Sequence, residues 1–357
     1  MKRKKIVKIA ILTLCLISIG IIGHKVQASE MKFGVNIILP ENQRNNIVGY
    51  FDLLMEPGTQ QVIEIELVSV SDEPITVLIE MANAMTDSAG VVHYQPQQGR
   101  ETSRDDTLVY AFKDMATMER SRIQLQPRET VRIPITIRMP EEPFDGVVAG
   151  GFGITQEFDI EAAREETNEM IIHVFSFEVP VIIRQNETRI SPDLELLDAY
   201  ASQRNWRNIV AAHLQNPERM FINQMNIYAR VTPANSNETL YEQFVESRQM
   251  APNSNFIFAI PLNGERFTSG DFLLHMEVDS DNGRWSFVRE FHITAEQART
   301  LNEMDVSIVR TPLWIFIAAG GGVLFVVFVT YMAIFKRKSK KTTENAVNEL
   351  LRQIRGE

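Results

Sequence analysis

The stretch that decides the fold lies at residues 131–138 and reads VRIPITIR. Every second residue from Val131 to Ile137 is apolar, and the residues between them are polar or proline. Successive side chains of a β-strand point to opposite faces of its sheet, so this pattern predicts a strand with one buried and one solvated face. Residues 63–67 read IEIEL and repeat the pattern.

Similar short runs, each bounded by turn-forming residues, recur along both halves of the chain. In the first half the further predicted strands are 33–38, 50–55, 75–81, 123–125 and the glycine-rich 147–154. In the second half they are 171–184, 208–215, 225–231, 256–260, 272–278 and 284–293. The last two flank Asp281-Asn282-Gly283, and Asn-Gly between apolar runs is a strong hairpin signal.

Short strands at this spacing are typical of a sandwich or barrel. We predict an all-β chain of two tandem immunoglobulin-like β-sandwich domains, at residues 30–155 and 171–303, followed by one transmembrane helix. Residues 156–170 are polar and acidic, and we interpret them as a linker. Thr294 and Gln297 have the spacing of a capping box and predict a short helix after the second domain.

The N-terminus has the pattern of a signal peptide, which we assign to residues 1–28. A basic stretch, Lys2 to Lys5, precedes an apolar run from Ile9 to Ile22, and Val26-Gln27-Ala28 then suits a signal peptidase. The alternative is a first transmembrane helix. The apolar run is shorter than the roughly 20 residues that a bilayer requires, which favours the signal peptide.

At the other end, residues 313–335 are uncharged and apolar, with Trp314 at one edge, and we predict that they cross the membrane. The basic tail, 336–357, then lies in the cytoplasm because cations next to a span mark that side. No Leu-Pro-x-Thr-Gly motif precedes the span. We therefore expect a retained single-pass anchor in the cell membrane, with the N-terminal domains outside the cell.

Composition excludes several classes of function. Between residues 29 and 335 the chain has 23 Lys and Arg against 43 Asp and Glu, a formal charge of about −20, which argues against binding nucleic acid. The one cysteine, Cys15, lies in the predicted signal peptide, so the mature chain has no disulfide. A secreted protein without disulfides suits a bacterium.

No motif for catalysis, a metal or a cofactor stands out. The sequence has no Gly-x-Ser-x-Gly elbow, phosphate loop or His-Glu-x-x-His helix. Residues 279–283 resemble half a calcium loop but lack the later Glu and coincide with the predicted hairpin turn. His275 and His292 are placed to meet across that hairpin, although strand histidines more often pack or face solvent. We expect a binding protein rather than an enzyme, with no cofactor.

Several polar and aromatic blocks resemble the WxL-interacting proteins of Gram-positive bacteria. In the first half they are Asn42-Gln43, Tyr50-Phe51-Asp52-Leu53, Pro57-Gly58, the block from Asn83 to Tyr94, and Gly150-Gly151 after Met139-Pro140. In the second half they are His213-Leu214-Gln215-Asn216-Pro217, the segment from Met250 to Phe256, and Trp285-Ser286-Phe287. Asp87 departs from the pattern, where Asn is expected.

The resemblance implies a first domain that binds peptidoglycan, a second that binds the host, and partners that are surface proteins with a WxL domain. On that basis we expect a scaffold at the cell wall, and the alternative is an adhesin whose second domain binds a host or extracellular-matrix protein. Amides and aromatics in loops suit a carbohydrate and are also ordinary turn residues. Our predicted peptidoglycan- or partner-binding residues are Asn42, Gln43, Tyr50, Asn83, Thr86 and Tyr94.

Overall fold

The computed structural model describes residues 31–96, 104–158 and 174–309, together with 321–322, 324–332, 334, 345 and 347. The predicted signal peptide lies outside the described residues, as do nearly all of the predicted linker and tail and part of the predicted anchor. Among the described residues no helix is both long and apolar enough to cross a membrane. The anchor therefore stays a prediction.

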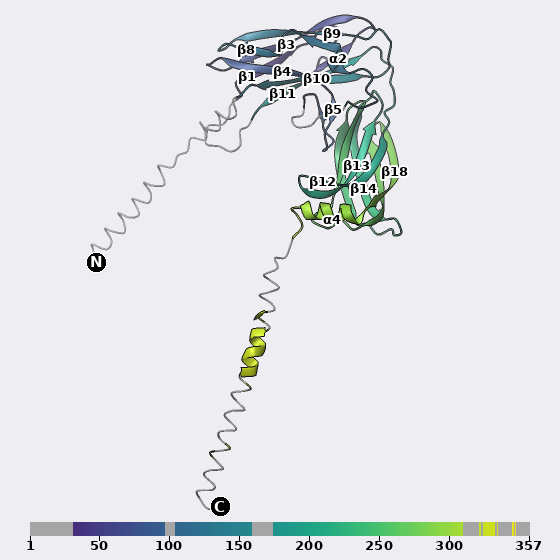
Figure 1. The fold of residues 1–357 in the computed structure, drawn as a ribbon. Coiled ribbons are helices and arrows are strands. Elements are labelled where there is room, and N and C mark those ends of the chain that lie inside the picture. The colour runs from purple at the N-terminus through teal and green to yellow at the C-terminus, as the bar shows by residue number, and fades with distance from the viewer. Residues whose placement is uncertain are drawn as a thin grey trace, which may run out of the picture. The chain divides into compact units, whose positions relative to one another are not determined.

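The first half of the chain forms two sheets in a β-sandwich-like arrangement (Figure 1). The four-stranded sheet has the order β1 (Phe33–Ile38), β3 (Gln60–Ser69), β9 (Thr130–Arg138), β7 (Ala116–Met118). The five-stranded sheet has the order β2 (Phe51–Leu54), β11 (Ser176–Arg184), β10 (Val148–Gln156), β4 (Ile75–Asn83), β8 (Arg122–Leu125). A two-stranded ribbon pairs β5 (Met85–Thr86) with β6 (Val92–His93).

The stretch VRIPITIR is β9, and its alternation predicts its buried face correctly. Ile133, Ile135 and Ile137 are buried, and β9 pairs antiparallel with β3, so that Ile63 lies opposite Ile135. Burying a large aliphatic side chain contributes about 1.5–3 kcal/mol, so the alternating isoleucines drive the two sheets together. The core also contains Phe112, from the short helix α2 (Phe112–Met115), whose ring meets Phe152 edge to face at 5.6 Å between centroids.

Strand β11 corrects one of the sequence-based assignments. We expected the run at 171–184 to open the second strand series, but β11 pairs antiparallel with β10 and parallel with β2 in the five-stranded sheet. Periodicity shows which face of a strand is buried and carries no information about which strand lies beside it. A fragment that ends at residue 155 would therefore lack a strand of the first sandwich.

The second half forms a three-stranded and a four-stranded sheet. Their strands are β12 (Glu195–Arg204), β13 (Arg207–Asn216) and β16 (Ser254–Pro261) in one sheet, and β15 (Tyr241–Met250), β14 (Ile222–Pro233), β17 (Gly270–Ser280) and β18 (Gly283–Ile293) in the other. The Asn-Gly signal is confirmed, because β17 and β18 are neighbours joined through Asp281 and Asn282. The sequence patterns missed β12 and β15.

The described residues divide into two compact units. The larger comprises the described part of Met1–Tyr200 with Val210–Pro261 and Gly270–His292, and the smaller comprises Ala201–Ile209, Leu262–Ser269 and the chain from Ile293 onwards. The smaller unit contains α4 (Ala295–Met304), where the predicted capping box is confirmed: Thr294 Oγ1 accepts from Gln297 N–H, and the Gln297 side chain accepts from Thr294 N–H.

Candidate functional site

Two of the predicted site residues, Tyr50 and Tyr94, line one cavity of about 400 Å³, which we call the tyrosine cavity. Tyr50 directly precedes β2, and Tyr94 directly follows β6. The other lining residues are Val147, Pro180, Ile182, Arg184, Met220, Phe221, Asn223 and Gln249. All of them belong to the larger compact unit. The cavity thus combines aromatic rings, aliphatic side chains and amides, which is the composition expected for a ligand site.

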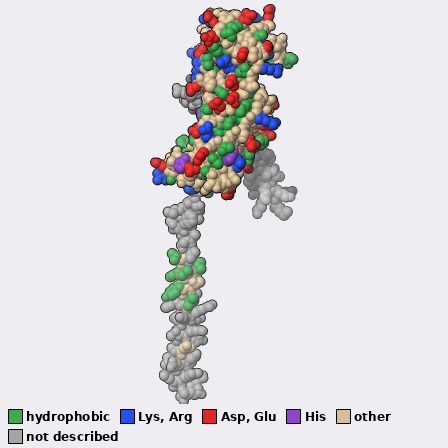
Figure 2. All heavy atoms as spheres, turned by 90° about the vertical axis from the view of Figure 1, so that its right-hand side faces the viewer, with side chains coloured by type: hydrophobic (Ala, Val, Ile, Leu, Met, Phe, Trp, Pro, Cys, Tyr) green, Lys and Arg blue, Asp and Glu red, His purple; other side chains and the backbone are tan. Residues whose placement is uncertain are grey.

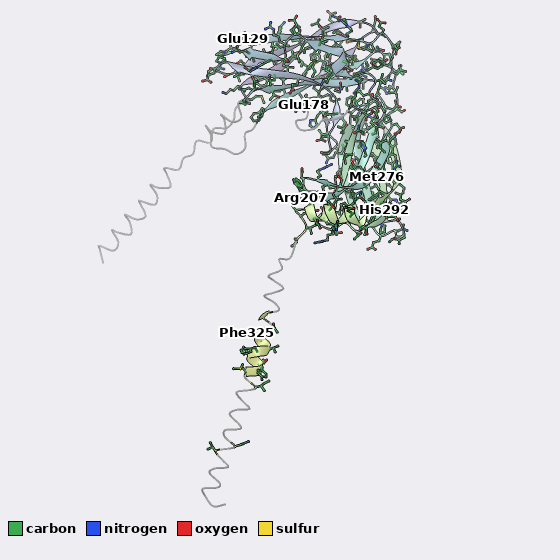
Figure 3. All side chains as sticks on the ribbon, in the orientation of Figure 1. Glu129, Glu178, Arg207, Met276, His292 and Phe325 are labelled. Carbon is green, nitrogen blue, oxygen red and sulfur yellow. The ribbon has the colours of Figure 1, made fainter. Side chains whose placement is uncertain are left out.

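Tyr94 is held in place by contacts with β10 and β11. Its backbone N–H donates to Glu178 Oε2 at 2.7 Å, and Glu178, labelled in Figure 3, also contacts His93 Nδ1 through Oε1 at 3.0 Å. Gly151 lies beneath Tyr94: a Cβ added there would lie 2.8 Å from Tyr94 Cβ and 2.5 Å from the Val179 carbonyl oxygen. The Gly-Gly strand therefore lets the tyrosine approach the backbone of the sheet.

Burial raises the pKa of Tyr94 well above its usual value, and the nearby Tyr50 and Glu178 raise it further. The phenol of Tyr94 is therefore neutral at physiological pH. Within the described part of the chain, neither Tyr50 nor Tyr94 hydroxyl makes a hydrogen bond. Gln249 Nε2 donates to Asn223 Oδ1 at 2.6 Å, which orients both amides on the cavity wall.

Asn42 and Gln43, also predicted as binding residues, are occupied inside the chain. Asn42 and Gln61 exchange two amide hydrogen bonds, at 2.8 and 2.7 Å. Gln43 is buried, donates to the backbone oxygens of Asn45 and Tyr50, and accepts from Asp52 N–H. These contacts hold the loop that leads into β2, and through the Tyr50 carbonyl they position Tyr50.

Asn83 and Thr86 likewise make internal contacts. Asn83 Oδ1 accepts from the backbone N–H of Lys113 at 3.1 Å, next to the start of α2. Thr86 is buried, and its Oγ1 accepts from Ala251 N–H and lies 2.9 Å from Ser254 Oγ. Ser254 uses its own proton for the Ala251 carbonyl, so Thr86 donates to Ser254. All of the hydroxyl's ordinary partners are then supplied by the protein.

Thr86 belongs to a set of buried and partly buried polar residues that joins the two halves of the chain, which we call the polar junction. Its members are Thr86, Asp105, Gln215, Asn253, Ser254 and Asn255. Four of the six come from the segments 213–217 and 250–256 that carry the family resemblance in the second half. Asn253 Nδ2 donates to the carbonyl oxygens of Thr107 and Pro217. These segments therefore serve contacts within the protein.

Asp105 is the centre of the polar junction. Its carboxylate accepts from Asn255 Nδ2 at 2.6 Å, from Gln215 Nε2 at 3.0 Å, and from both the N–H and the hydroxyl of Thr107. Burial by itself raises the pKa of Asp105, but the hydrogen bonds from Asn255, Thr107 and Gln215 outweigh it and hold that pKa below its usual value. The hydrogen bonds of the polar junction therefore stabilise the ionised form of Asp105.

A second cavity, of about 420 Å³, shares Val147, Arg184 and Met220 with the tyrosine cavity. Three arginines line it, Arg44, Arg184 and Arg189, so we call it the arginine cavity. Sequence reasoning missed all three. The one sequence feature that could have indicated Arg44 is its position directly after the Asn42-Gln43 block. Arg184 pairs with Asp52, and because the two are 132 residues apart, no local pattern indicates the pair.

The other features considered from the sequence do not come together as a site. His275 Nε2 lies 3.4 Å from Thr232 Oγ1, and His292 contacts Asp271, so the two histidines have separate partners. Asp279, from the half calcium loop, accepts from Arg284. Among the described residues no group of three or more His, Cys, Asp or Glu is arranged to hold a metal ion. Figure 2 shows acidic and basic side chains interspersed on the visible face.

Two family models match the chain in sequence. One, described as WxL Interacting Protein, peptidoglycan binding domain, matches residues 33–156, and the other, WxL Interacting Protein, host binding domain, matches residues 166–303. The chain belongs to the WxL-interacting protein family. The tyrosines and Gly151 lie in the first matched region, whereas Gln215, Asn253, Ser254 and Asn255 lie in the second. Both matched families are described as binding domains, which supports a surface binding protein.

No curated protein matches this WxL-interacting protein in sequence. Among solved structures, the E. coli chaperone DraB is 12% identical over 73% of this chain and 99% of its own, with a TM-score of 0.27. The Pseudomonas aeruginosa CupB2 chaperone is 11% identical over 66% of this chain and 95% of its own, with a TM-score of 0.28. At these TM-scores the likenesses contribute nothing to the functional assignment.

Proposed function

We propose that the protein is a non-enzymatic scaffold at the cell surface that contacts peptidoglycan through the tyrosine cavity. The observation that carries the proposal is that Tyr50 and Tyr94, from separate loops of the peptidoglycan-binding domain, line one cavity together with the amides of Asn223 and Gln249. An aromatic ring offers a flat face to the apolar side of a sugar ring, and amides hydrogen-bond to hydroxyl and acetamido groups. The glycan strand of peptidoglycan presents all of these groups.

Retention at the membrane follows from the ends of the sequence. We infer that residues 1–28 are a signal peptide and that residues 313–335 anchor two immunoglobulin-like domains outside the cell, the first of which includes β11. Such an anchor keeps the peptidoglycan-binding domain near the inner face of the wall. We further propose that surface proteins with a WxL domain are the partners that the scaffold holds there. The alternative, an adhesin, uses the host-binding domain to contact a host or extracellular-matrix protein.

Co-sedimentation with purified, insoluble peptidoglycan tests the glycan contact. The full chain in mild detergent is compared with a variant that combines Tyr50→Ala and Tyr94→Ala. Loss of two aromatic anchors at the centre of a site is expected to weaken binding at least tenfold. Tyr228→Ala is the matched control, because Tyr228 lies on β14 and its hydroxyl donates to Glu242 rather than lining the cavity.

Three outcomes of this experiment would lead to different conclusions about the function. Equal sedimentation of the double variant and the wild type would contradict the tyrosine cavity as the contact. Release of soluble wall fragments during the incubation would show hydrolysis, and the protein would then be an enzyme. Failure of the wild-type chain to sediment at all would remove direct peptidoglycan binding and leave the partner scaffold to be judged separately.

Pull-down from detergent-solubilised membranes tests the scaffold role. The full chain is expected to recover a protein that carries a WxL domain. Recovery of a host matrix protein, in the absence of any WxL-domain protein, would favour the adhesin instead.

A further inference from the structure

We propose that the arginine cavity binds a carboxylate of the peptidoglycan stem peptide while the tyrosine cavity holds the sugar. This inference rests on the proposed function and adds the chemical class that the neighbouring cavity recognises. In peptidoglycan the peptide branches directly from the sugar strand, so a ligand that fills one cavity brings an acidic peptide to the edge of the other.

The charges on the wall of the arginine cavity favour an anion. Its charged lining residues are Arg44, Arg184, Arg189 and a single acid, Glu187. Two further acids stand behind the wall: Asp52 accepts from Arg44 and Arg184, and Asp145 accepts from Asn186. The lining residues themselves have two more positive than negative charges, and the two acids behind them bring the cluster to three of each sign.

The three arginines form one electrostatic group. Glu187 accepts two hydrogen bonds from Arg44, at 2.8 and 2.6 Å. This contact comes first among the causes that lower the pKa of Glu187, and the charges of Arg44, Arg184 and Arg189 all add to it. Glu187 is an exposed carboxylate held by the guanidinium of Arg44, so this cluster already binds one carboxylate within the protein.

Arg184 has one buried donor without a partner among the described residues. Its Nη2 donates to Asp52 Oδ1 at 2.8 Å, but its Nε is buried and has no hydrogen-bond partner among the described residues. A buried N–H without an acceptor is unfavourable, and such groups are rare in folded proteins. Arg184 also lines both cavities, which makes it the point where a sugar and its peptide would meet.

A second arginine-lined cavity in the same protein provides a contrast. Between β8 and β9, a cavity of about 590 Å³ is lined by Arg120, Arg122 and Arg132 together with Glu119 and Glu129. The side chains of Arg122 and Arg132 are 67% and 62% exposed, against 30% for Arg44 and 19% for Arg184. Charges in water are screened by salt and bind weakly. We therefore assign the anion site to the cavity that contains the two less exposed arginines, Arg44 and Arg184, with Arg189 as its exposed member.

Calorimetric titration of the full chain in detergent tests the assignment with three soluble probes. They are a disaccharide tetrapeptide with free carboxylates, the same molecule with its carboxylates amidated, and an N-acetylglucosamine oligosaccharide without peptide. The free acid is expected to bind about tenfold more tightly than the amide, a difference of about 1.4 kcal/mol. Arg189→Gln is expected to reduce that difference, because it removes one of the three positive charges of the lining; Arg189 is exposed, so its loss should leave the fold intact. Arg132→Gln is the control and is expected to preserve it.

The outcomes distinguish this inference from the proposed function. Equal affinity for the acid and the amide, with the oligosaccharide still bound, would overturn the carboxylate site and leave sugar binding in place. Binding of none of the three probes would overturn both. Displacement of the acid by a glycerol phosphate oligomer at equal or lower concentration would also overturn the assignment, because the cavity would then recognise phosphate instead.

Discussion

The polar junction and the tyrosine cavity are both built from residues that look alike in the sequence. In the junction the hydrogen-bonding groups of Thr86 and Asp105 meet partners within the chain. In the cavity the hydroxyls of Tyr50 and Tyr94 have none among the described residues. The comparison shows that a polar motif in the sequence indicates a binding site only where the folded protein leaves the hydrogen-bond donors and acceptors of that motif without internal partners. The junction should therefore determine stability, and the cavity should determine affinity.

The largest effect is expected at Asp105. Asp105→Ala leaves the partly buried amides of Gln215 and Asn255 and the Thr107 N–H without their acceptor, which should cost roughly 3 kcal/mol of unfolding free energy. For a unit of this size that corresponds to a fall in Tm of roughly 6–12 °C. Thermal unfolding followed by circular dichroism measures it. At temperatures well below the unfolding transition, binding to the wall should stay at the wild-type level. A large loss of binding at those temperatures would show that the polar junction also determines affinity.

A smaller effect is expected for Thr86→Val, which removes the bridging hydroxyl and keeps the shape of the side chain. The Ala251 N–H then loses its acceptor, and we expect a loss of about 2 kcal/mol. Thr117→Val is the matched control, because Thr117 is exposed on β7, and it should change stability by less than about 0.5 kcal/mol. If Thr86→Val instead weakens wall binding with an unchanged Tm, Thr86 contacts the ligand.

Asn42→Ala should cost about 1 kcal/mol, since it removes a partly buried amide pair with Gln61. Chemical denaturation measures this loss, and co-sedimentation measures wall binding in parallel. Our sequence-based prediction placed Asn42 in the binding site, whereas its contacts in the structure predict unchanged affinity. A tenfold loss of affinity would support the sequence-based prediction.

The smallest effect near neutral pH concerns the ionisation of Asp105. Its pKa is lower in the folded than in the unfolded chain, so it stabilises the fold above the unfolded value and loses this contribution as the pH falls through the folded value. We expect an unchanged Tm from pH 7 to about 5 and a decline below about pH 4. Asp105→Asn should flatten that decline. An equally steep decline in the variant would assign it to other carboxylates.

Much of the fold follows from periodicity, and the rest depends on contacts between distant segments. The alternation in β9 and the Asn282-Gly283 turn identify their elements directly. Strand β15 escaped because its residues read YEQFVESRQM, polar on both faces of an edge strand. Strand β11 has a clear pattern, but its place beside β10 is a long-range choice that one sequence does not encode locally.

The site divides in the same way. Tyr50 and Tyr94, predicted from aromatic residues in loops, line a common cavity, and their role in binding stays a prediction. Asn42, Gln43, Asn83 and Thr86 have the same composition signal, yet internal partners occupy them, and no local pattern reveals a partner such as Gln61 or Ser254. The sequence did not predict the arginine cavity for the same reason.

Photo-crosslinking tests most directly whether peptidoglycan occupies the tyrosine cavity. Benzoylphenylalanine replaces Tyr50 in one variant and the exposed Phe244 on β15 in another, and each full chain is irradiated with purified wall before digestion. Mass spectrometry then identifies any sugar attached to the protein. We predict glycan adducts at position 50 and none at position 244. Adducts at position 244 with none at position 50 would contradict the assignment of the tyrosine cavity.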